Sequence, residues 1–208
     1  MMLRELGGIC GNVFKLDGAV KKTTIKNCYN LGEVSSNTSG TNDANLGGIV
    51  GGLLADAEVK YCYNLGPIKK TGGGNHVGGL IGYCSNAAVI GACWNSGNVS
   101  SSYYFVGGLC GRIDDASIAY CYINRAAVVQ INGIAVTAQI GTDWPKSSSY
   151  GRLLGYAKST NCYSNLGEVN SEEMPTVYDV LNEFGETDST IWDKTNPNEP
   201  KLLWELQQ

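Results

Sequence analysis

Charged side chains are scarce in this sequence. Asp, Glu, Lys and Arg make up 16% of its 208 residues, whereas about a quarter is usual in soluble proteins. Hydrophobic residues reach 43%, which excludes the highly charged, weakly hydrophobic composition of disordered chains. No stretch of 18 or more apolar residues occurs, and no segment concentrates basic residues into a stripe. We therefore expect neither a membrane-spanning helix nor a nucleic-acid partner.

Cysteine is present at too low a density for a disulfide scaffold, since eight in 208 residues is about 4%. Zinc sites need cysteines two to four residues apart, and the closest pair here, Cys84 and Cys93, is nine residues apart. We expect no metal and no cofactor, and we expect the thiols to be mostly free and buried.

Glycine, by contrast, is abundant, at 28 of 208 residues, and it marks an internal repeat. A segment with the pattern apolar-Gly-Gly-apolar-apolar-Gly recurs at Leu6–Gly11, Leu46–Gly51, Val77–Gly82 and Val106–Gly111, with a degenerate copy at Tyr150–Gly155. Glycine suits tight corners, because it tolerates positive φ and close backbone approach. The alternative, a phosphate-binding loop, requires a helix directly after the glycines, and no copy is followed by a helical pattern.

A second block follows each glycine segment and carries a cysteine, an aromatic residue and an asparagine. The repeat is roughly 30 residues long, which is too short to bury a hydrophobic face alone, so the copies must stack. The short segments between Gly and Asn are β-branched and aromatic, as in strands, and helical periodicity is absent from residues 1–169. The sequence therefore predicts an all-β protein, a parallel β-solenoid of the right-handed β-helix type with about five coils and about three strands per coil.

Stacking in register would place the repeated residues in columns. The predicted thiol column inside the solenoid comprises Cys28, Cys62, Cys93, Cys121 and Cys162. An amide ladder at a corner is expected from Asn30, Asn64, Asn95, Asn124 and Asn165.

The aromatic column allows two interpretations. Its members are Tyr29, Tyr63, Trp94, Tyr122 and Tyr163. Alternation along a strand puts these rings opposite the cysteines, as an exposed stripe able to bind sugars or proteins. A bend in the chain would instead let them pack on a loop or cap, and we favour packing.

These blocks resemble the GLUG repeat of bacterial proteins. The copies at Leu46–Gly51, Val77–Gly82 and Val106–Gly111 match its hydrophobic-Gly-Gly-hydrophobic-hydrophobic-Gly pattern closely, and the resemblance covers most of residues 6–169. GLUG repeats occur in large secreted or wall-attached proteins, including some immunoglobulin-cleaving zinc metallopeptidases, and they imply a parallel β-solenoid. The His-Glu-x-x-His pair of those peptidases is absent, so their activity is not implied. In the fifth copy Arg152 replaces the second glycine, so that corner is expected to differ.

Two observations bear on location. The first residues lack the apolar segment and cleavage site of a secretion signal, which by itself favours the cytoplasm. The chain also begins directly inside a repeat, as a piece of a longer protein would. The GLUG resemblance implies an extracellular or cell-surface location, and we expect a monomer.

Residues 170–208 differ from the repeats and are expected to form a separate capping segment after a solenoid of residues 1–169. Apolar residues at helical spacing predict a short helix over Thr176–Phe184, and Gly185 would end it. Trp192 and Trp204 follow, in a segment expected to add a strand. Terminal caps cover the open edge and core of a solenoid's last coil, so both tryptophans are interpreted as structural.

Catalysis has little support in the sequence. Triads based on Ser–His or Cys–His depend wholly on His76, the single histidine. The alternative function is a polysaccharide-degrading β-helix enzyme that uses surface carboxylates. Its candidate acids lie in the same turn of the second and fourth coils and are Asp56, Glu58, Asp114 and Asp115.

The favoured function is a non-catalytic structural or binding module of a bacterial surface protein, adhesive toward a glycan or a host protein. The longest insertions follow strands expected to end at Val34, Ile68, Val99 and Val128, so they would leave the stack at one corner. Loops gathered on one edge of a solenoid often form its binding face. The candidate contact residues are Tyr103, Tyr104, Trp144 and His76. The alternative is that these loops are tolerated insertions without a ligand.

Overall fold

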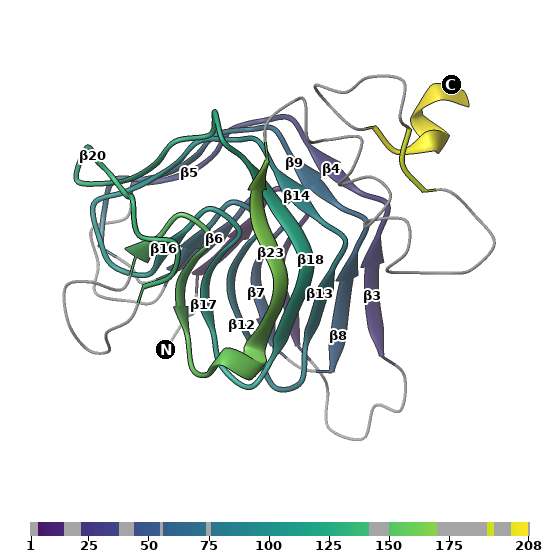
Figure 1. Ribbon diagram of the computed structural model, residues 1–208, viewed down its shortest axis with the longest axis horizontal. Helices are drawn as coiled ribbons and strands as arrows, with labels where there is room; N and C mark the ends of the chain where they lie inside the picture. Colours follow the sequence, from purple (N-terminus) through teal and green to yellow (C-terminus); the bar gives the residue numbers. More distant parts are fainter. Residues whose placement is uncertain are drawn as a thin grey trace.

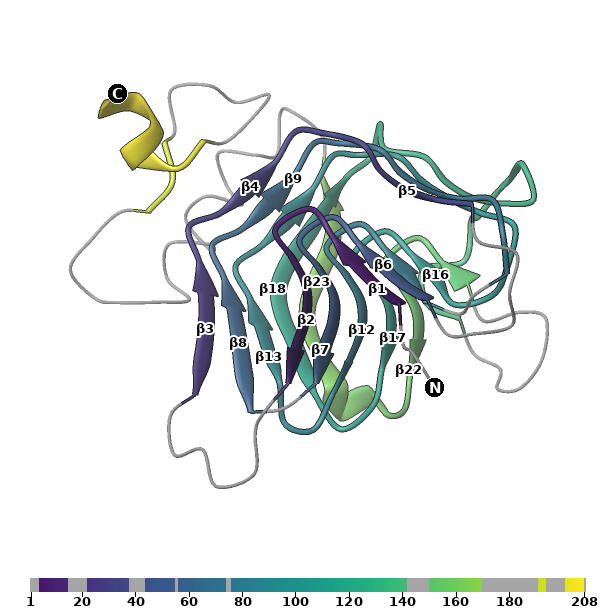
Figure 2. The same ribbon diagram turned by 180° about the vertical axis from the view of Figure 1, so that it is seen from behind.

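The computed structural model describes residues 4–14, 22–37, 44–54, 56–73, 76–141, 150–169, 191–193 and 201–207. These residues form a parallel β-solenoid, which confirms the predicted fold class (Figures 1 and 2). Successive coils stack strand on strand, and every ladder between neighbouring coils is parallel. An antiparallel hairpin, β19 with β20, projects at one corner.

Each full coil contains five short strands rather than the three expected. The strands of the first coil are β1 (Arg4–Gly7), β2 (Cys10–Phe14), β3 (Thr23–Lys26), β4 (Tyr29–Asn30) and β5 (Val34–Ser36). Those of the second are β6 (Ala44–Gly47), β7 (Val50–Leu54), β8 (Ala57–Lys60), β9 (Tyr63–Asn64) and β10 (Ile68–Lys70). Those of the third are β11 (Val77–Gly78), β12 (Ile81–Ser85), β13 (Val89–Gly91), β14 (Trp94–Asn95) and β15 (Val99–Ser101).

The later coils vary this plan. The fourth has β16 (Val106–Gly107), β17 (Cys110–Ile113), β18 (Ser117–Asn124), β19 (Val129–Ile131) and the hairpin strand β20 (Ile134–Ala135). The fifth has β21 (Tyr150–Gly151), β22 (Leu154–Ala157), the 3-10 turn η1 (Thr160–Cys162) and β23 (Tyr163–Val169). A second 3-10 turn, η2 (Leu203–Gln207), lies near the C-terminus.

Corresponding strands form four stacked sheets. The sheet of β1, β6, β11, β16 and β21 is called here the first sheet, and that of β2, β7, β12, β17 and β22 the second. The third sheet runs from β3 and β4 through β8, β9, β13, β14 and β18 to β23, and the fourth contains β5, β10, β15, β19 and β20. The hydrophobic core fills the space that these sheets enclose, with fully buried residues such as Leu46, Ile81 and Ile118.

A residue with left-handed backbone conformation, that is with positive φ, forms the corner within the third sheet. In coils one to four this residue directly precedes the repeated cysteine and is Asn27, Tyr61, Ala92 or Tyr120, with φ between 51° and 55°. Positive φ is costly for residues other than glycine, and asparagine tolerates it best. In the first three coils the turn divides the expected single strand into two, which accounts for part of the higher strand count, whereas β18 of the fourth coil continues through Tyr120.

In the first three coils the second glycine of the repeat is required by close packing against the asparagine ladder. A Cβ added to Gly48 would lie 2.5 Å from the Asn64 Cγ and would also overlap the Gly79 carbonyl oxygen of the next coil. Asn64 belongs to the predicted amide ladder. Its Nδ2 donates to Asn95 Oδ1 at 2.8 Å, and its Oδ1 accepts from Asn30 Nδ2 at 2.8 Å.

The ladder ends at Asn95, and the predicted alignment of Asn124 is wrong. Tyr122 pairs with Trp94, but Ile123, one residue earlier than expected, pairs with Asn95. Ile123 is an extra residue in the fourth repeat, and its apolar side chain packs near Gly108 instead of an amide. Asn124 instead accepts a hydrogen bond from the Ala126 backbone N–H at 2.9 Å.

The fifth coil is shifted by four residues from the predicted alignment. Leu166 pairs with Cys121, so Cys162 lies outside the thiol column, in η1. Asn165 instead takes the left-handed corner position, with φ of 48°, and leaves the amide ladder. With this shift an asparagine occupies the left-handed corner and a leucine points inward. This alignment is favoured over the one that would match the Cys-Tyr motif, because asparagine tolerates positive φ.

The same shift explains why Arg152 is accepted where other coils have glycine. Glu168 pairs with Ile123 and so occupies the ladder position in the fifth coil. The Arg152 Nε bonds to the Glu168 Oε1, and its Nη2 donates to the Ala127 carbonyl at 3.1 Å. The glycine–asparagine contact of earlier coils is thus replaced by an arginine–glutamate ion pair.

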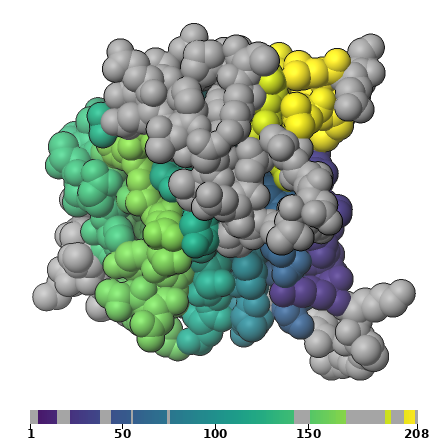
Figure 3. All heavy atoms as spheres, turned by 45° about the vertical axis from the view of Figure 1, so that its right-hand side comes forward, coloured from purple at the N-terminus to yellow at the C-terminus, as the bar shows by residue number. Residues whose placement is uncertain are grey.

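The described C-terminal residues lie against the side of the solenoid, not over its last coil. Trp192 and Leu202 pair in an antiparallel bridge and pack on Tyr61, Tyr63 and Trp94 of coils two and three. Figure 3 shows residues 191–193 and 201–207 in yellow beside the purple first coil. The expected cap over the fifth coil is therefore wrong for this part of the segment. The helix predicted at 176–184 lies outside the described residues.

Candidate functional site

The insertions leave the solenoid at one corner, between the fourth and first sheets. The strands there begin at Val34, Ile68, Val99 and Val129 rather than ending near these positions, and each is followed by a loop to the next coil. This corner is at the left of Figure 1, beside β20. We call it the loop edge, represented in the described part of the chain by Tyr103, Tyr104 and the residues that directly follow β5, β10 and β15.

Tyr103 and Tyr104 form an exposed pair on the loop edge. Their side chains are 41% and 36% exposed, and their ring centroids lie 4.6 Å apart with the planes tilted by 54°. The Tyr103 backbone N–H donates to Ser101 Oγ at 3.0 Å, which fixes the start of the turn. Trp144 lies outside the described residues, so its place beside the two tyrosines stays a prediction.

His76 is buried, although the sequence placed it among the ligand contacts of the loop edge. It is 7% exposed, and its Nδ1 donates to Asn45 Oδ1 at 2.5 Å. Asn45 Nδ2 in turn donates to Glu5 Oε1 at 2.9 Å, which requires the Asn45 oxygen to face the imidazole. His76 lies between the outward side chains of two sheets, so it supports the surface rather than being presented on it.

Burial also sets the charge of His76. Desolvation, with a smaller contribution from the Arg112 charge, lowers the pKa of His76 to about 3. The ring is therefore neutral at physiological pH, with its proton on Nδ1. It stacks on Tyr83, with ring centroids 4.9 Å apart and planes 23° apart, and also contacts Phe105.

A row of outward side chains on the second sheet begins at Tyr83. Arg112 and Tyr156 occupy the same position on the next two coils, as the strand register shows. The Arg112 guanidinium carbon lies 5.7 Å from the Tyr83 ring centroid, 5.4 Å from that of Phe105 and 5.8 Å from that of Tyr156. Cation–π contacts with three rings hold this guanidinium in place.

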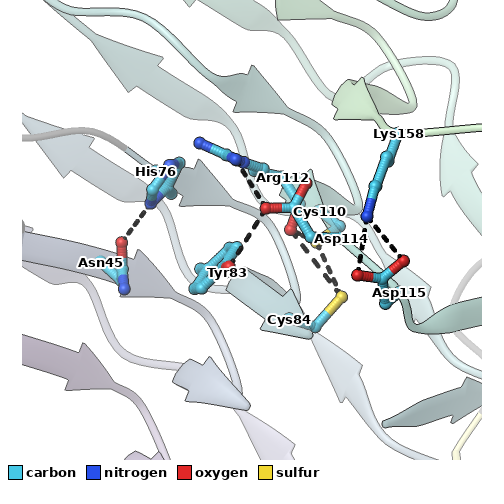
Figure 4. Close-up of polar contacts among 9 residues, drawn as sticks. All are labelled: Asn45, His76, Tyr83, Cys84, Cys110, Arg112, Asp114, Asp115 and Lys158. Carbon is cyan, nitrogen blue, oxygen red and sulfur yellow. Dashed lines mark hydrogen bonds and ion pairs between the residues drawn. The ribbon is translucent and has the colours of Figure 1, made fainter. Parts of the chain in front are cut away.

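These residues form one wall of an open pocket of about 350 Å³, called here the Arg112 pocket. Figure 4 shows the polar contacts of five residues of its lining, which are Tyr83, Arg112, Asp114, Asp115 and Lys158. Its lining residues are Tyr83, Ser85, Asn86, Arg112, Asp114, Asp115, Tyr156 and Lys158. Strand β12 contributes Tyr83 and Ser85, β17 contributes Arg112 and β22 contributes Tyr156, and the turns after these strands contribute the rest.

Two aspartates of the Arg112 pocket are engaged in ion pairs. Asp114 Oδ2 lies 2.6 Å from Arg112 Nη2 and accepts from the Tyr83 hydroxyl at 3.1 Å. Asp115 is bonded by Lys158 Nζ at 2.8 Å. Burial raises the pKa of Tyr83, so its hydroxyl keeps the proton that it donates.

The acids of the second coil are engaged in the same way. Glu58 bonds Lys22 Nζ at 2.9 Å and lies 3.4 Å from Lys60 Nζ, and Asp56 lies 3.5 Å from Lys22 Nζ. The hydrogen bond from Lys22 is the main cause that lowers the pKa of Glu58. The four carboxylates of the alternative enzyme hypothesis thus each lie beside a cation.

The aromatic column stands on the outer face of the third sheet and is covered by the C-terminal residues. Tyr29, Tyr63 and Trp94 stack with centroids 5.2 Å apart at each step and interplanar angles of 11° and 17°. Trp192 packs against Tyr63, and Trp204 stacks on Tyr29 at 6.0 Å. Alternation of side chains along the strands thus places these rings on the outer face, where the C-terminal residues cover them. The described part of this column is therefore not an open binding stripe.

Four cysteines form the inward column, and their thiols share one contact. Each Sγ donates to the carbonyl oxygen two residues earlier, at 3.2 or 3.3 Å, in Cys28, Cys62, Cys93 and Cys121. The thiol therefore fills the core and also satisfies the carbonyl next to the left-handed corner residue. A separate contact joins Cys84 and Cys110, whose sulfurs are 3.8 Å apart.

We expect native protein to react with a thiol reagent at few positions and denatured protein at all eight. Every cysteine lies in the described residues, is unpaired with another in a disulfide, and is buried except for the half-buried Cys10 and Cys28. Burial raises the pKa of Cys84 and Cys93 well above the usual thiol range, so little reactive thiolate forms. Labelling with dithionitrobenzoate before and after denaturation measures this, and three or more disulfides by mass spectrometry would contradict it.

The sequence contained a signal for the Arg112 pocket that our reasoning missed. Tyr83, Arg112 and Tyr156 each directly follow the last glycine of their repeat, so stacking places them in one row. In the first two coils this position holds Asn12 and Gly52. In the part of the chain that the structure describes, no three His, Cys, Asp or Glu side chains are grouped as metal ligands, and neither helical turn is long and apolar enough to cross a membrane.

Comparisons with known proteins bear on the fold alone. No protein-family model and no curated protein matches the chain. Among solved structures, the chain is similar to one described as a putative immunoglobulin A1 protease from Bacteroides ovatus, with a TM-score of 0.66 and 20% sequence identity. The alignment covers 97% of this chain and 64% of that one, so this chain spans less than two thirds of its neighbour.

Proposed function

We propose that this chain is a non-catalytic binding module of a bacterial surface protein, which adheres to a host glycan or glycoprotein through the loop edge. The observation that carries the proposal is the exposed pair Tyr103 and Tyr104 at the corner where the loops leave the stack. Tyrosine is enriched at interfaces, because its ring supplies apolar area and its hydroxyl a hydrogen bond.

The extracellular location is part of the proposal and is supported by the GLUG resemblance. The solved structure that shares this fold is described as a protease, but it is longer than this chain and 20% identical to it. A β-solenoid serves as a rigid scaffold on which loops vary without disturbing the stacked strands. This favours a role in presenting a contact surface within a larger protein.

The ion pairs of Asp114 and Asp115 favour binding over the alternative, polysaccharide hydrolysis. The acid and the base of a glycosidase are two carboxyl groups that face the bond to be broken. Asp114 and Asp115 are instead each engaged by a cation, Arg112 and Lys158. We expect no release of reducing sugar from neutral or acidic polysaccharides.

Replacing Tyr103 and Tyr104 together by serine is expected to abolish adhesion and to leave the melting temperature unchanged. Both rings are exposed, so their removal takes little apolar area from the core. Binding is measured on a glycan array and on immobilised host glycoproteins, each with and without enzymatic deglycosylation. Loss of binding on deglycosylation identifies the glycan as the ligand.

Phe14→Ser provides the matched control, because Phe14 is 60% exposed and lies at the end of β2, away from the loop edge. This variant should bind like the unaltered chain. If the tyrosine variant still adheres fully, or if both variants lose adhesion equally, the loop edge is not the contact surface.

A further inference from the structure

We propose that the Arg112 pocket is a second, separate binding site, and that it takes a neutral saccharide. The pocket lies on the second sheet rather than at the loop edge, and its residues belong to three successive coils. The proposal does not depend on what the loop edge binds.

The wall of the pocket that Tyr83 and Arg112 form is fixed before any ligand arrives. Arg112 is held among three aromatic rings and by Asp114, and Tyr83 rests on the buried imidazole of His76. His76 is itself held by a hydrogen bond to Asn45 of the second coil, and Asn45 bonds to Glu5 of the first coil. A preorganised site loses little conformational entropy on binding.

The balance of charge points to a neutral ligand. Two cations, Arg112 and Lys158, face two anions, Asp114 and Asp115, so the formal charge of the lining is zero. An anionic ligand would be repelled by the two carboxylates, and a cationic ligand would be repelled by Arg112 and Lys158. A hydroxyl group donates and accepts at once, and it can therefore bond to either member of each ion pair.

The remaining lining and the size of the pocket agree with a sugar. Ser85 and Asn86 add neutral donors and acceptors, and Tyr156 adds a half-buried ring that can pack against the apolar face of a pyranose. Its volume of about 350 Å³ is at the small end of the range for ligand sites, which is about 300–1,000 Å³. One or two sugar units would fill it, with any longer chain extending into solvent through the open side.

The test is a titration of the isotopically labelled chain with defined sugars, followed by NMR. The neutral probes are lactose, N-acetyllactosamine, mannobiose and chitobiose, and digalacturonic acid is the acidic comparison. At least one neutral probe should shift the backbone signals of Tyr83, Arg112 and Tyr156, and digalacturonic acid should bind more weakly than that probe. Replacing Asp115 and Lys158 together by alanine should weaken binding about tenfold or more, as expected for losing hydrogen bonds to charged groups.

The chain offers a matched control for this double substitution. Asp56 occupies the position in the second coil that Asp115 occupies in the fourth, since Glu58 and Ser117 both pair with Val89. Asp56 lies beside Lys22, as Asp115 lies beside Lys158. Replacing Lys22 and Asp56 by alanine removes a comparable surface ion pair outside the pocket and should leave the affinity unchanged.

Three results would overturn the proposal. These are the absence of shifts in the pocket with every neutral probe, equal binding by the two double variants, and tighter binding of digalacturonic acid. Shifts confined to Tyr103 and Tyr104 would reject the pocket and support the loop edge. Sugar binding in the pocket together with failed adhesion would support the pocket and reject the proposed function.

Discussion

Replacing Trp192 by alanine is expected to lower the free energy of unfolding by about 3–5 kcal/mol, the usual cost of removing a buried tryptophan. Trp192 is fully buried and packs against Tyr63, with ring centroids 6.1 Å apart. Its removal opens a cavity between the C-terminal residues and the third sheet. Urea denaturation monitored by circular dichroism measures the change, with the slope m as a check on two-state behaviour.

Trp204→Ala is the comparison, because this ring is 37% exposed and stacks on Tyr29 near the first coil. Its loss should cost clearly less than that of Trp192. Equal effects would show that the deeper burial of Trp192 does not set the size of its contribution. A Trp192 variant as stable as the unaltered chain would show that the packing of Trp192 on the third sheet does not stabilise the solenoid.

Deletion of residues 170–208 is the stronger version of the same change. It removes Trp192, Leu202 and also Glu205, whose carboxylate accepts the Tyr63 hydroxyl at 3.0 Å. The stacked rings of Tyr63 and Trp94 would then face solvent as an apolar stripe, and stripes of that kind promote association. Light scattering should show oligomers of the truncated chain, and a monomer with an unchanged melting temperature would contradict this role.

The repeat made the fold predictable from the sequence. A glycine block and a Cys-aromatic-Asn block at similar spacing have few solutions besides stacked coils, and Asn30, Asn64 and Asn95 stack as expected. The number of strands was harder to predict. Alanine and tyrosine are not typical turn residues, so the sequence does not indicate the positive φ of Ala92 and Tyr61. The position of that turn is fixed by the neighbouring coils.

The fifth coil shows where pattern matching fails. Cys162 and Tyr163 match the motif by letters, but Leu166 fills the inward position and Asn165 the corner. The choice between these alignments depends on backbone conformation and on an ion pair, Arg152 with Glu168, between residues 16 apart in sequence. Neither is visible in a comparison of residue types.

The candidate site was only partly predictable for a related reason. The sequence shows that Tyr83, Arg112 and Tyr156 share a position, but not that the outward side chains of the first and second sheets meet. His76 stacks on Tyr83 across that junction, which converts an apparent loop residue into a buried one. The angle between two sheets is a property of the whole stack, so it does not follow from any single repeat.

Acidification is expected to destabilise the protein through His76. Its pKa is lowered by burial to about 3 in the folded state, against an ordinary value of about 6.5 in the unfolded chain. Between these values the unfolded chain binds a proton that the folded protein does not. The contribution to stability is therefore present above about pH 6.5 and is lost as the pH falls toward 3. Between pH 7 and pH 4 the loss should be about 3 kcal/mol, at about 1.4 kcal/mol per pKa unit.

His76→Gln isolates this contribution, because glutamine stays neutral at every pH and can still donate to Asn45 Oδ1. The carboxylates nearest to His76 are Glu5, behind Asn45, and Asp114, on Arg112, and both remain in the variant. Urea denaturation at pH 7, 6, 5 and 4 should give a shallower loss of stability for His76→Gln than for the unaltered chain. Parallel curves for the two proteins would show that His76 is not held neutral by its burial against Tyr83 and Arg112.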